Sequence, residues 1–430
     1  MSLDHRIEHR ILSNGISVVS VPLPNTEAVT LMVFMGVGSR YERDDQQGLA
    51  HFTEHMVFKG GVRYKSTREI SEALDAVGGE FNAYTSHEYT VFYTKTGAPY
   101  LTLGLDVISD MLLNPTFPPA ELEKEKGVIV EEINMYEDMP MRKVDQLLGE
   151  LLFGDTGMGR PIIGTKESVT AFTDKDFHAY LKERFVGSQC TIVVAGAVGG
   201  DEVATQIEQY FGNMPKGESY KPVPAVMLTP DCRVKIEDKK SEQSHLMLSL
   251  EAFPNTDPRR MALRVLATIL GGNMSSRLFA HVREEQGLCY YVRAMTDTYV
   301  DAGFLVALAG VDNTRLTQAV KAIMDQLRLI RKEGVTEAEL NRAKQYLTGK
   351  TLLAMEDSEN VAEYYAAQDR LEGKRETPAE VLKQLDSVTL ADVRNITNDL
   401  FLDETLRLAV IGPQGGKERE LEALLTFSSN

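Results

Sequence analysis

Two histidines and one glutamate lie close together in the segment GLAHFTEHMVFKG, as His51, Glu54 and His55. At about 100° of rotation per residue, a helix places all three within about 100° of arc on one face. Two imidazoles at positions i and i+4 can bind one tetrahedral metal ion, with the carboxylate beside them. The alternative is a chance string of hydrogen-bonded core histidines. The apolar neighbours favour a metal, because a buried polar cluster needs a compensating partner.

A third protein ligand is expected on the helix predicted for AELEKEKGVIVEEINMYED, residues 120–138. The apolar residues expected to form its buried stripe are Leu122, Val128, Ile129, Met135 and Tyr136. Glu125 and Glu132 fall on that stripe, whereas Glu131 faces the solvated side. Glu125 and Glu132 are about 10 Å apart along the axis, so one metal cannot easily bind both. The spacing predicts Glu132 as the ligand and Glu125 as an auxiliary carboxylate; the alternative is two glutamates at the edge of an amphipathic helix.

The elements that must position these residues can be predicted from local patterns in the first half of the chain. Residues 6–35 alternate as strands, with Asn14-Gly15 as a hairpin turn. Ser66 and Glu69 fit a capping box that begins a helix, which Gly78-Gly79 ends. A strand is predicted next, in EFNAYTSHEYTVFYTKT.

The second half repeats this order loosely. Residues 211–232 are rich in proline and glycine and are predicted to link two domains. Strand, helices and strands then follow again, and Thr336 with Glu339 fits a second capping box. We therefore predict an α+β fold of two homologous domains, each a mostly antiparallel sheet packed by helices. The predicted divisions are 1–215 for the metal-binding domain, 216–233 for the linker and 234–430 for the C-terminal domain.

Composition excludes several classes of protein. The 430 residues carry a formal net charge of −17 and show no basic stripe, which argues against a nucleic-acid partner. The three cysteines are too few and too widely spaced for a disulfide framework. No run of about 18 apolar residues occurs, so no membrane segment is predicted, and the chain as given is expected to be cytoplasmic.

H-x-x-E-H followed 77 residues later by a helix glutamate resembles the inverzincin metallopeptidases, the family of pitrilysin, insulysin and the mitochondrial processing peptidase. The residues here are His51, Glu54, His55 and Glu132, with Glu125 seven positions before the last. The resemblance implies one Zn²⁺ per chain, held by the two histidines and Glu132. It implies that Glu54 activates water as a general base and that Glu125 has an auxiliary catalytic role.

Two further segments extend the resemblance. GGEFNAYTSHEYTVFY resembles the edge strand with which the family pairs substrate backbone, and it implies substrate binding by Asn82, Ala83 and Thr85. GGNMSSRLFAHVREEQGLCYYV resembles an R-x6-Y segment, giving Arg283 and Tyr290 as groups that bind substrate and stabilise the transition state. Without the resemblance, the last two would be ordinary surface residues.

The resemblance covers nearly the whole chain, and two repeats point to the short, bacterial-type branch of the family. It implies a zinc endopeptidase that cleaves short or unfolded peptides inside a chamber formed by two chains. A homodimer is expected because one chain carries both the metal motif in its first half and Arg283 with Tyr290 in its second half. The alternative is a catalytically silent or partner-dependent structural or processing subunit of the same fold. A silent subunit would be expected to have a broken H-x-x-E-H, which is intact here.

Overall fold

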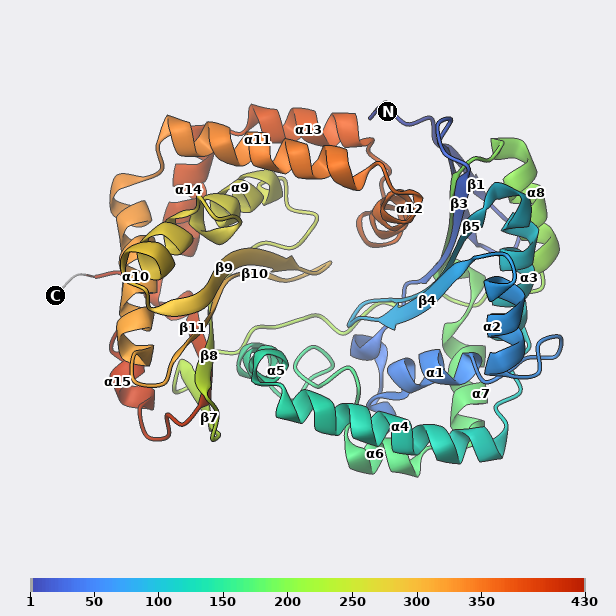
Figure 1. The fold of residues 1–430 in the computed structure, drawn as a ribbon, viewed down its shortest axis with the longest axis horizontal. Coiled ribbons are helices and arrows are strands. Elements are labelled where there is room, and N and C mark those ends of the chain that lie inside the picture. The colour runs from blue at the N-terminus through green and yellow to red at the C-terminus, as the bar shows by residue number, and fades with distance from the viewer. Residues whose placement is uncertain (1–2, 429–430) are drawn as a thin grey trace. The chain divides into compact units, whose positions relative to one another are not determined.

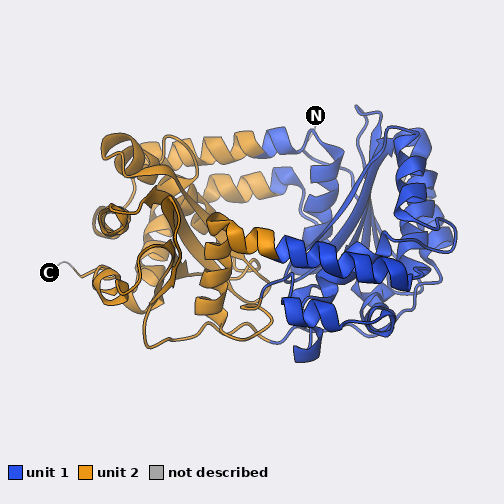
Figure 2. Cartoon of the chain, turned by 60° about the horizontal axis from the view of Figure 1, so that its bottom comes forward, with its two compact units in different colours: residues 1–133, 161–223, 351–380 blue, residues 134–160, 224–350, 381–430 orange. Residues whose placement is uncertain are grey.

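The computed structural model describes residues 3–428 as two compact units, each built on one sheet (Figures 1 and 2). Unit 1 comprises residues 1–133, 161–223 and 351–380. Unit 2 comprises residues 134–160, 224–350 and 381–430. The division falls inside three helices, which are α4 (Pro119–Asp138), α11 (Glu337–Ala354) and α13 (Pro378–Ser387).

The sheet of unit 1 has six strands in the order β1-β2-β6-β3-β5-β4, so β4 forms one edge. Neighbouring strands are antiparallel except for β2 and β6. A turn with Gly15 at φ +92° joins β1 to β2, as the predicted hairpin requires. The strands are β1 (Glu8–Ile11), β2 (Ser17–Pro22), β3 (Ala28–Met35), β4 (Glu80–Thr85), β5 (Thr90–Gly97) and β6 (Cys190–Gly196).

The sheet of unit 2 has five strands in the order β7-β11-β8-β10-β9, with only β7 and β11 parallel. Without β1, the first sheet has the same connectivity, because β2 to β6 correspond in turn to β7 to β11. The predicted fold class, two homologous α+β domains, is confirmed. The strands are β7 (Val234–Asp238), β8 (Gln243–Glu251), β9 (Cys289–Thr298), β10 (Gly303–Asp312) and β11 (Leu406–Gly412).

Helices cover the sheets of both units (Figure 1). Those of unit 1 are α1 (Leu49–Val57), α2 (Thr67–Asp75), α3 (Leu101–Leu113), α6 (Lys166–Ala171), α7 (Asp174–Arg184), α8 (Gly200–Phe211) and α12 (Ser358–Ala367). Those of unit 2 are α5 (Pro140–Phe153), α9 (Arg260–Gly271), α10 (Leu316–Glu333), α14 (Leu390–Leu400) and α15 (Glu418–Glu422). The capping box predicted at α11 is present, because Thr336 and Glu339 each accept the other's backbone N–H.

One helix from each half of the sequence packs on the sheet formed by the other half. Helix α5 packs on β8 and β11, where Leu148 joins a core that includes Phe304. Helix α12 packs on β3 and β6, where Tyr365 joins a core that includes Phe34. Residues 216–233 contain neither helix nor strand. A division there would place α5 with the first sheet and α12 with the second, which is the reverse of their packing.

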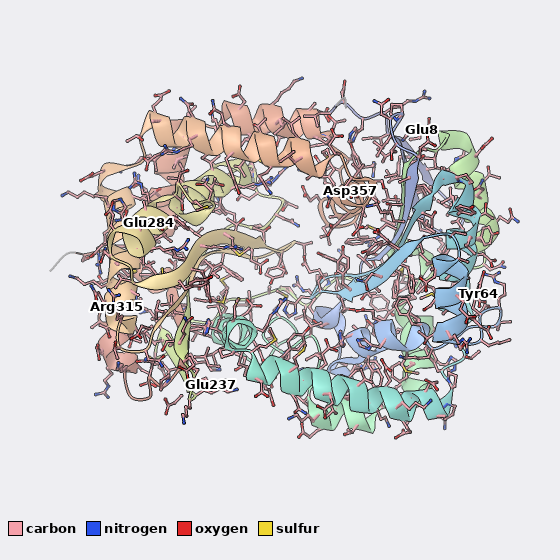
Figure 3. All side chains as sticks on the ribbon, in the orientation of Figure 1. Glu8, Tyr64, Glu237, Glu284, Arg315 and Asp357 are labelled. Atoms are coloured by element: carbon pink, nitrogen blue, oxygen red, sulfur yellow. The ribbon has the colours of Figure 1, made fainter. Side chains whose placement is uncertain are left out.

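Polar contacts tie α12 to the two strands at the β4 edge. Asp357, labelled in Figure 3, accepts the N–H of Glu359 at 2.7 Å and so caps the helix. Its other oxygen lies 2.8 Å from Nζ of Lys95 on β5. The Tyr84 hydroxyl of β4 donates to Glu363 at 2.8 Å. The face of the first sheet opposite α1 is therefore covered by α12, a helix from the second half of the sequence.

Candidate metal centre

Helix α1, which carries the motif, begins at a carboxylate cap. Gly48 precedes it with φ +90°, and the carboxylate of Glu42 accepts the N–H groups of Gly48 (2.9 Å) and Ala50 (2.6 Å). These are amides that a helix start leaves without an intrahelical partner. On the apolar side, the ring of Phe52 packs on Phe177, with centroids 4.9 Å apart. The start and the rotation of α1 are thus both fixed by its surroundings.

Replacement of Glu42 by alanine is expected to lower the free energy of unfolding by about 1–2 kcal/mol, because two amides at the start of α1 lose a charged acceptor. Urea denaturation measures the change. Glu131→Ala, which removes an exposed glutamate from α4, is the control and should change stability by less than about 0.5 kcal/mol. Equal stabilities of the two variants would show that the Glu42 cap contributes nothing.

Three side chains from α1 and α4 converge on one point. His51, His55 and Glu132 each offer a ligand atom within 4.8 Å of the others, and they are the one such group found among the residues that the structure describes. Oε2 of Glu132 lies 3.9 Å from Nε2 of His51 and 3.7 Å from Nε2 of His55. The two imidazole rings are 4.7 Å apart at an angle of 53°.

This donor set fits a zinc ion. Bonds of about 2.0–2.1 Å at tetrahedral angles separate ligand atoms by about 3.3 Å, close to the distances found here. Two imidazoles and one carboxylate form a known ligand set of catalytic zinc, which leaves one position open. Burial and the nearby His55 lower the pKa of His51 to about 3, so its ring stays in the neutral form that binds metals. Nδ1 of His51 is buried and has no hydrogen-bond partner among residues 3–428, which leaves packing to orient that ring.

Glu54 lies beside this group without belonging to it. It is 8% exposed, and its Oε2 accepts the hydroxyl of Thr85 at 2.6 Å. Burial raises the pKa of Glu54, while the Thr85 hydrogen bond and the charge of His55 act in the opposite direction. A carboxylate with a raised pKa next to a metal site suits proton transfer near neutral pH.

Glu125 joins the two helices through both of its oxygens. Its Oε1 lies 2.8 Å from Nδ1 of His55, and its Oε2 lies 2.6 Å from Nζ of Lys59. Burial lowers the pKa of His55, but the hydrogen bond to Glu125 and nearby carboxylates outweigh it and raise the pKa overall. Burial raises the pKa of Glu125, but the hydrogen bonds from His55 and Lys59 outweigh it and lower the pKa overall. Glu125 therefore orients the imidazole of His55.

The buried line of α4 differs from the predicted apolar stripe. Val128 and Met135 were expected inside, but they are 50% and 48% exposed. The buried residues of this helix are Leu122, Glu125, Ile129 and Ile133. Glu132 lies next to that line and is partly buried, whereas Glu131 is exposed, in the order that the spacing predicted. The error arose because hydrophobic type alone cannot show how wide the buried face of a helix is.

The edge strand β4 lies against α1. Side chains alternate along a strand, so Ala83 and Thr85 face the α1 side and Asn82 faces the α12 side. The Ala83 N–H donates to Oδ1 of Asn82 at 2.9 Å. Thr85 thus contacts the motif through Glu54, while Asn82 and Ala83 lie further along the same edge.

The remaining two predicted residues lie in unit 2. Arg283 belongs to the π-helix η5 (Phe279–Glu285), and Tyr290 belongs to β9, an edge strand of the second sheet. Cζ of Arg283 lies 6.0 Å from the centroid of the Tyr290 ring, and Tyr290 is 76% exposed. The structure brings these two residues near each other within their own unit.

Sequence reasoning missed two residues that support the site, Glu42 and Lys59. The position of Lys59, four residues after His55, was a usable signal, because i and i+4 residues share a helix face. Glu42 had no such signal, since a carboxylate in a loop can cap any helix start that the fold brings to it. None of the helices in the described part of the chain has the length and hydropathy needed to cross a membrane.

Two family models match successive parts of the chain. Residues 17–166 match the sequence model of insulinase (peptidase family M16), and residues 171–347 match that of the peptidase M16 inactive domain. The uncharacterized zinc protease YmxG of Bacillus subtilis is 35% identical over 412 residues, covering 95% of this chain and 99% of that protein. An uncharacterized zinc protease of Streptomyces coelicolor is 34% identical over 421 residues, covering 96% and 91%.

Solved structures share the fold. A protease from Helicobacter pylori superposes with a TM-score of 0.88 at 22% identity, covering 95% of this chain and all of that one. A peptidase M16 inactive domain from Pseudomonas fluorescens also gives 0.88, at 19% identity and with 95% and 98% covered. At these identities the likeness concerns the fold alone.

Proposed function

The chain belongs to the insulinase family of M16 peptidases, and from this premise we propose that it is a zinc-dependent endopeptidase that cleaves short or unfolded peptides. The observation that carries the proposal is the convergence of His51, His55 and Glu132, with Glu54 beside them on the same helix. The relatives are named zinc proteases, which supports a zinc cofactor and a proteolytic activity for this chain. We assign one ion per chain, because the described residues contain one such group.

The chemistry divides between the ion and the protein. A bound zinc ion would polarise a water molecule and lower its pKa toward about 7. Glu54 lies beside the group that would hold the ion, where its carboxylate would accept a proton from the attacking water and deliver it to the leaving amine. Thr85 holds the Glu54 carboxylate through one oxygen, which leaves the other for proton transfer. His51, His55 and Glu132 are assigned as ligands, and Glu125 orients His55.

The substrate is proposed to add to the open edge of β4 as an extended strand. Backbone pairing gives affinity with little dependence on sequence, and alternate side chains then determine selectivity. Asn82, Ala83 and Thr85 belong to that strand, and Thr85 contacts Glu54 of the motif. This mode requires an extended substrate, which short and unfolded peptides supply and folded proteins do not.

Arg283 and Tyr290 are proposed to bind the substrate and to donate hydrogen bonds to the carbonyl oxygen as negative charge develops on it. The assignment rests on the resemblance of their segment, together with their proximity to each other. We further propose a homodimer that encloses a chamber and a cytoplasmic location. Light scattering after gel filtration would establish the number of chains.

A silent or partner-dependent subunit remains the second candidate, because residues 171–347 match an inactive-domain model. The metal group lies outside that match, since its histidines precede residue 171 and so does Glu132. An intact ligand set and a buried base in residues 17–166 favour an active enzyme.

Metal analysis combined with a peptide-library digest tests the proposed function. The purified chain is expected to contain one zinc ion and to cleave short unstructured peptides. A chelator should abolish cleavage, and added zinc should restore it, because the water-activating ion is removed and returned. A folded protein of similar size serves as the substrate control and should stay intact. Undiminished cleavage by metal-free protein would exclude the metallopeptidase assignment, and zinc binding without any cleavage would favour the silent subunit.

A further inference from the structure

Lys59 completes a chain of contacts that ends at a proposed metal ligand. It lies one helical turn after His55 on α1, and Glu125 of α4 bridges the two. The two oxygens of the carboxylate have different partners, at 2.8 Å for the imidazole and 2.6 Å for the ammonium group. A carboxylate bound at both oxygens cannot rotate without breaking one contact.

The orientation of His55 depends on this carboxylate. Nδ1 of His55 is the atom that contacts Glu125, and Nε2 is the atom that faces Glu132 at 3.7 Å. A hydrogen bond at one ring nitrogen fixes which nitrogen is left to bind a metal. His51 has no equivalent contact within the described part of the chain, where its buried Nδ1 has no hydrogen-bond partner. The bridge through Glu125 therefore orients one histidine of the pair.

Lys59 also balances the charge of the site. With a divalent ion bound, the negative charges of Glu54, Glu125 and Glu132 would be offset by that ion together with the ammonium group of Lys59, which contacts Glu125. The side chains of Lys59 and Glu125 are only 17% and 8% exposed, so solvent screens this pair poorly. Loss of one partner of a buried ion pair leaves the other uncompensated.

From these contacts we propose that Lys59 is a positioning residue of the metal site, which acts on zinc affinity through Glu125 and His55. The inference rests on the proposed function, because it requires that the group binds zinc. Lys59 contacts neither the ion nor the substrate in this role. It holds the Glu125 carboxylate against Nδ1 of His55, so that Nε2 of His55 is left facing Glu132 and the place where the ion would bind.

Zinc affinity of variants, measured by competition with a chromophoric chelator, tests the proposal. Lys59→Met is expected to weaken zinc binding about 10–100-fold, the range found when groups that orient ligands are removed. Lys126→Met is the matched control, because Lys126 is 14% exposed and pairs with Glu123 on α4 at 2.8 Å. It should bind zinc within about twofold of the unaltered chain. Lys59→Gln, which removes the charge but keeps a polar side chain, supplies the same measurement if Lys59→Met does not fold.

A double-mutant cycle shows whether the effect passes through Glu125. The Lys59→Met/Glu125→Gln protein is expected to bind zinc no more weakly than Glu125→Gln alone. Affinity that falls by the product of the two single effects would overturn the proposed route. Affinity of Lys59→Met within twofold of the unaltered chain would overturn the proposal itself. An unaltered chain that binds no zinc would instead overturn the proposed function, so the two failures are distinguishable.

Discussion

Glu54→Gln is expected to keep its zinc and to lose about 10²–10⁴-fold in kcat, the range attributed to positioned general bases. The amide keeps the size of the side chain and can still accept the Thr85 hydroxyl through its oxygen. It cannot accept the proton of the attacking water. Since Glu54 is not part of the metal group, the ligand set is unchanged. Initial rates with a fluorogenic peptide give kcat, and metal analysis of the same sample gives the zinc content.

The control for this variant is Glu72→Gln, which changes an exposed glutamate on α2 of the same unit. It should retain both zinc and activity. Turnover near the normal rate in zinc-loaded Glu54→Gln protein would remove Glu54 from the proton-transfer role. Loss of zinc from that variant would place Glu54 among the ligands, contrary to the geometry.

Glu132→Ala is expected to lose zinc and activity together, whereas Glu131→Ala should keep both. The two glutamates are adjacent on α4, but only Glu132 lies within ligand distance of the histidines. Removal of one of three protein ligands should weaken zinc binding more than the 10–100-fold lost when outer groups are changed. Zinc content after dialysis and chelator competition measure the difference.

This pair of variants separates metal binding from helix effects, because alanine is introduced on the same turn in each. His55→Ala should behave like Glu132→Ala, with loss of both zinc and activity. A Glu132→Ala protein that binds zinc normally would contradict the ligand assignment. Loss of zinc from Glu131→Ala instead would mean that the neighbouring carboxylate is the ligand.

The group of His51, His55 and Glu132 could be predicted from the sequence largely because these residues lie on two helices with local signals. His51, Glu54 and His55 fall within five residues, so helical geometry alone places them together. The choice of Glu132 over Glu131 followed from the amphipathic pattern, although the details of that pattern were wrong at Val128 and Met135. The choice of Glu132 survived this error because Glu132 lies beside the buried residues Ile129 and Ile133, at the edge of the buried face.

Other parts of the site depend on contacts that no local pattern encodes. The Glu42 cap and the Thr85 contact join segments that are separate in sequence, so only the folded structure brings them together. The same limit applies to the sheets. Alternation predicted several of the strands, but it gave residues 80–96 as one strand where the structure has two, β4 and β5. It also could not show that α5 and α12 each pack on the sheet of the other half. Periodicity identifies which face of a helix is buried, and it does not identify the partner.

The exchange of α5 and α12 has a consequence for the order of folding on the ribosome. The last strand of the first sheet ends at Gly196, but the helix that covers one face of this sheet ends at Ala367, about 170 residues later. At the usual rate of about 5–20 residues per second, synthesis leaves that face uncovered for roughly 10–30 s. Its apolar side chains, Phe34 and Val193 among them, are meanwhile open to binding by chaperones or by other nascent chains. The N-terminal half is therefore translated as an incomplete domain, and its core closes only after most of the second half has been made.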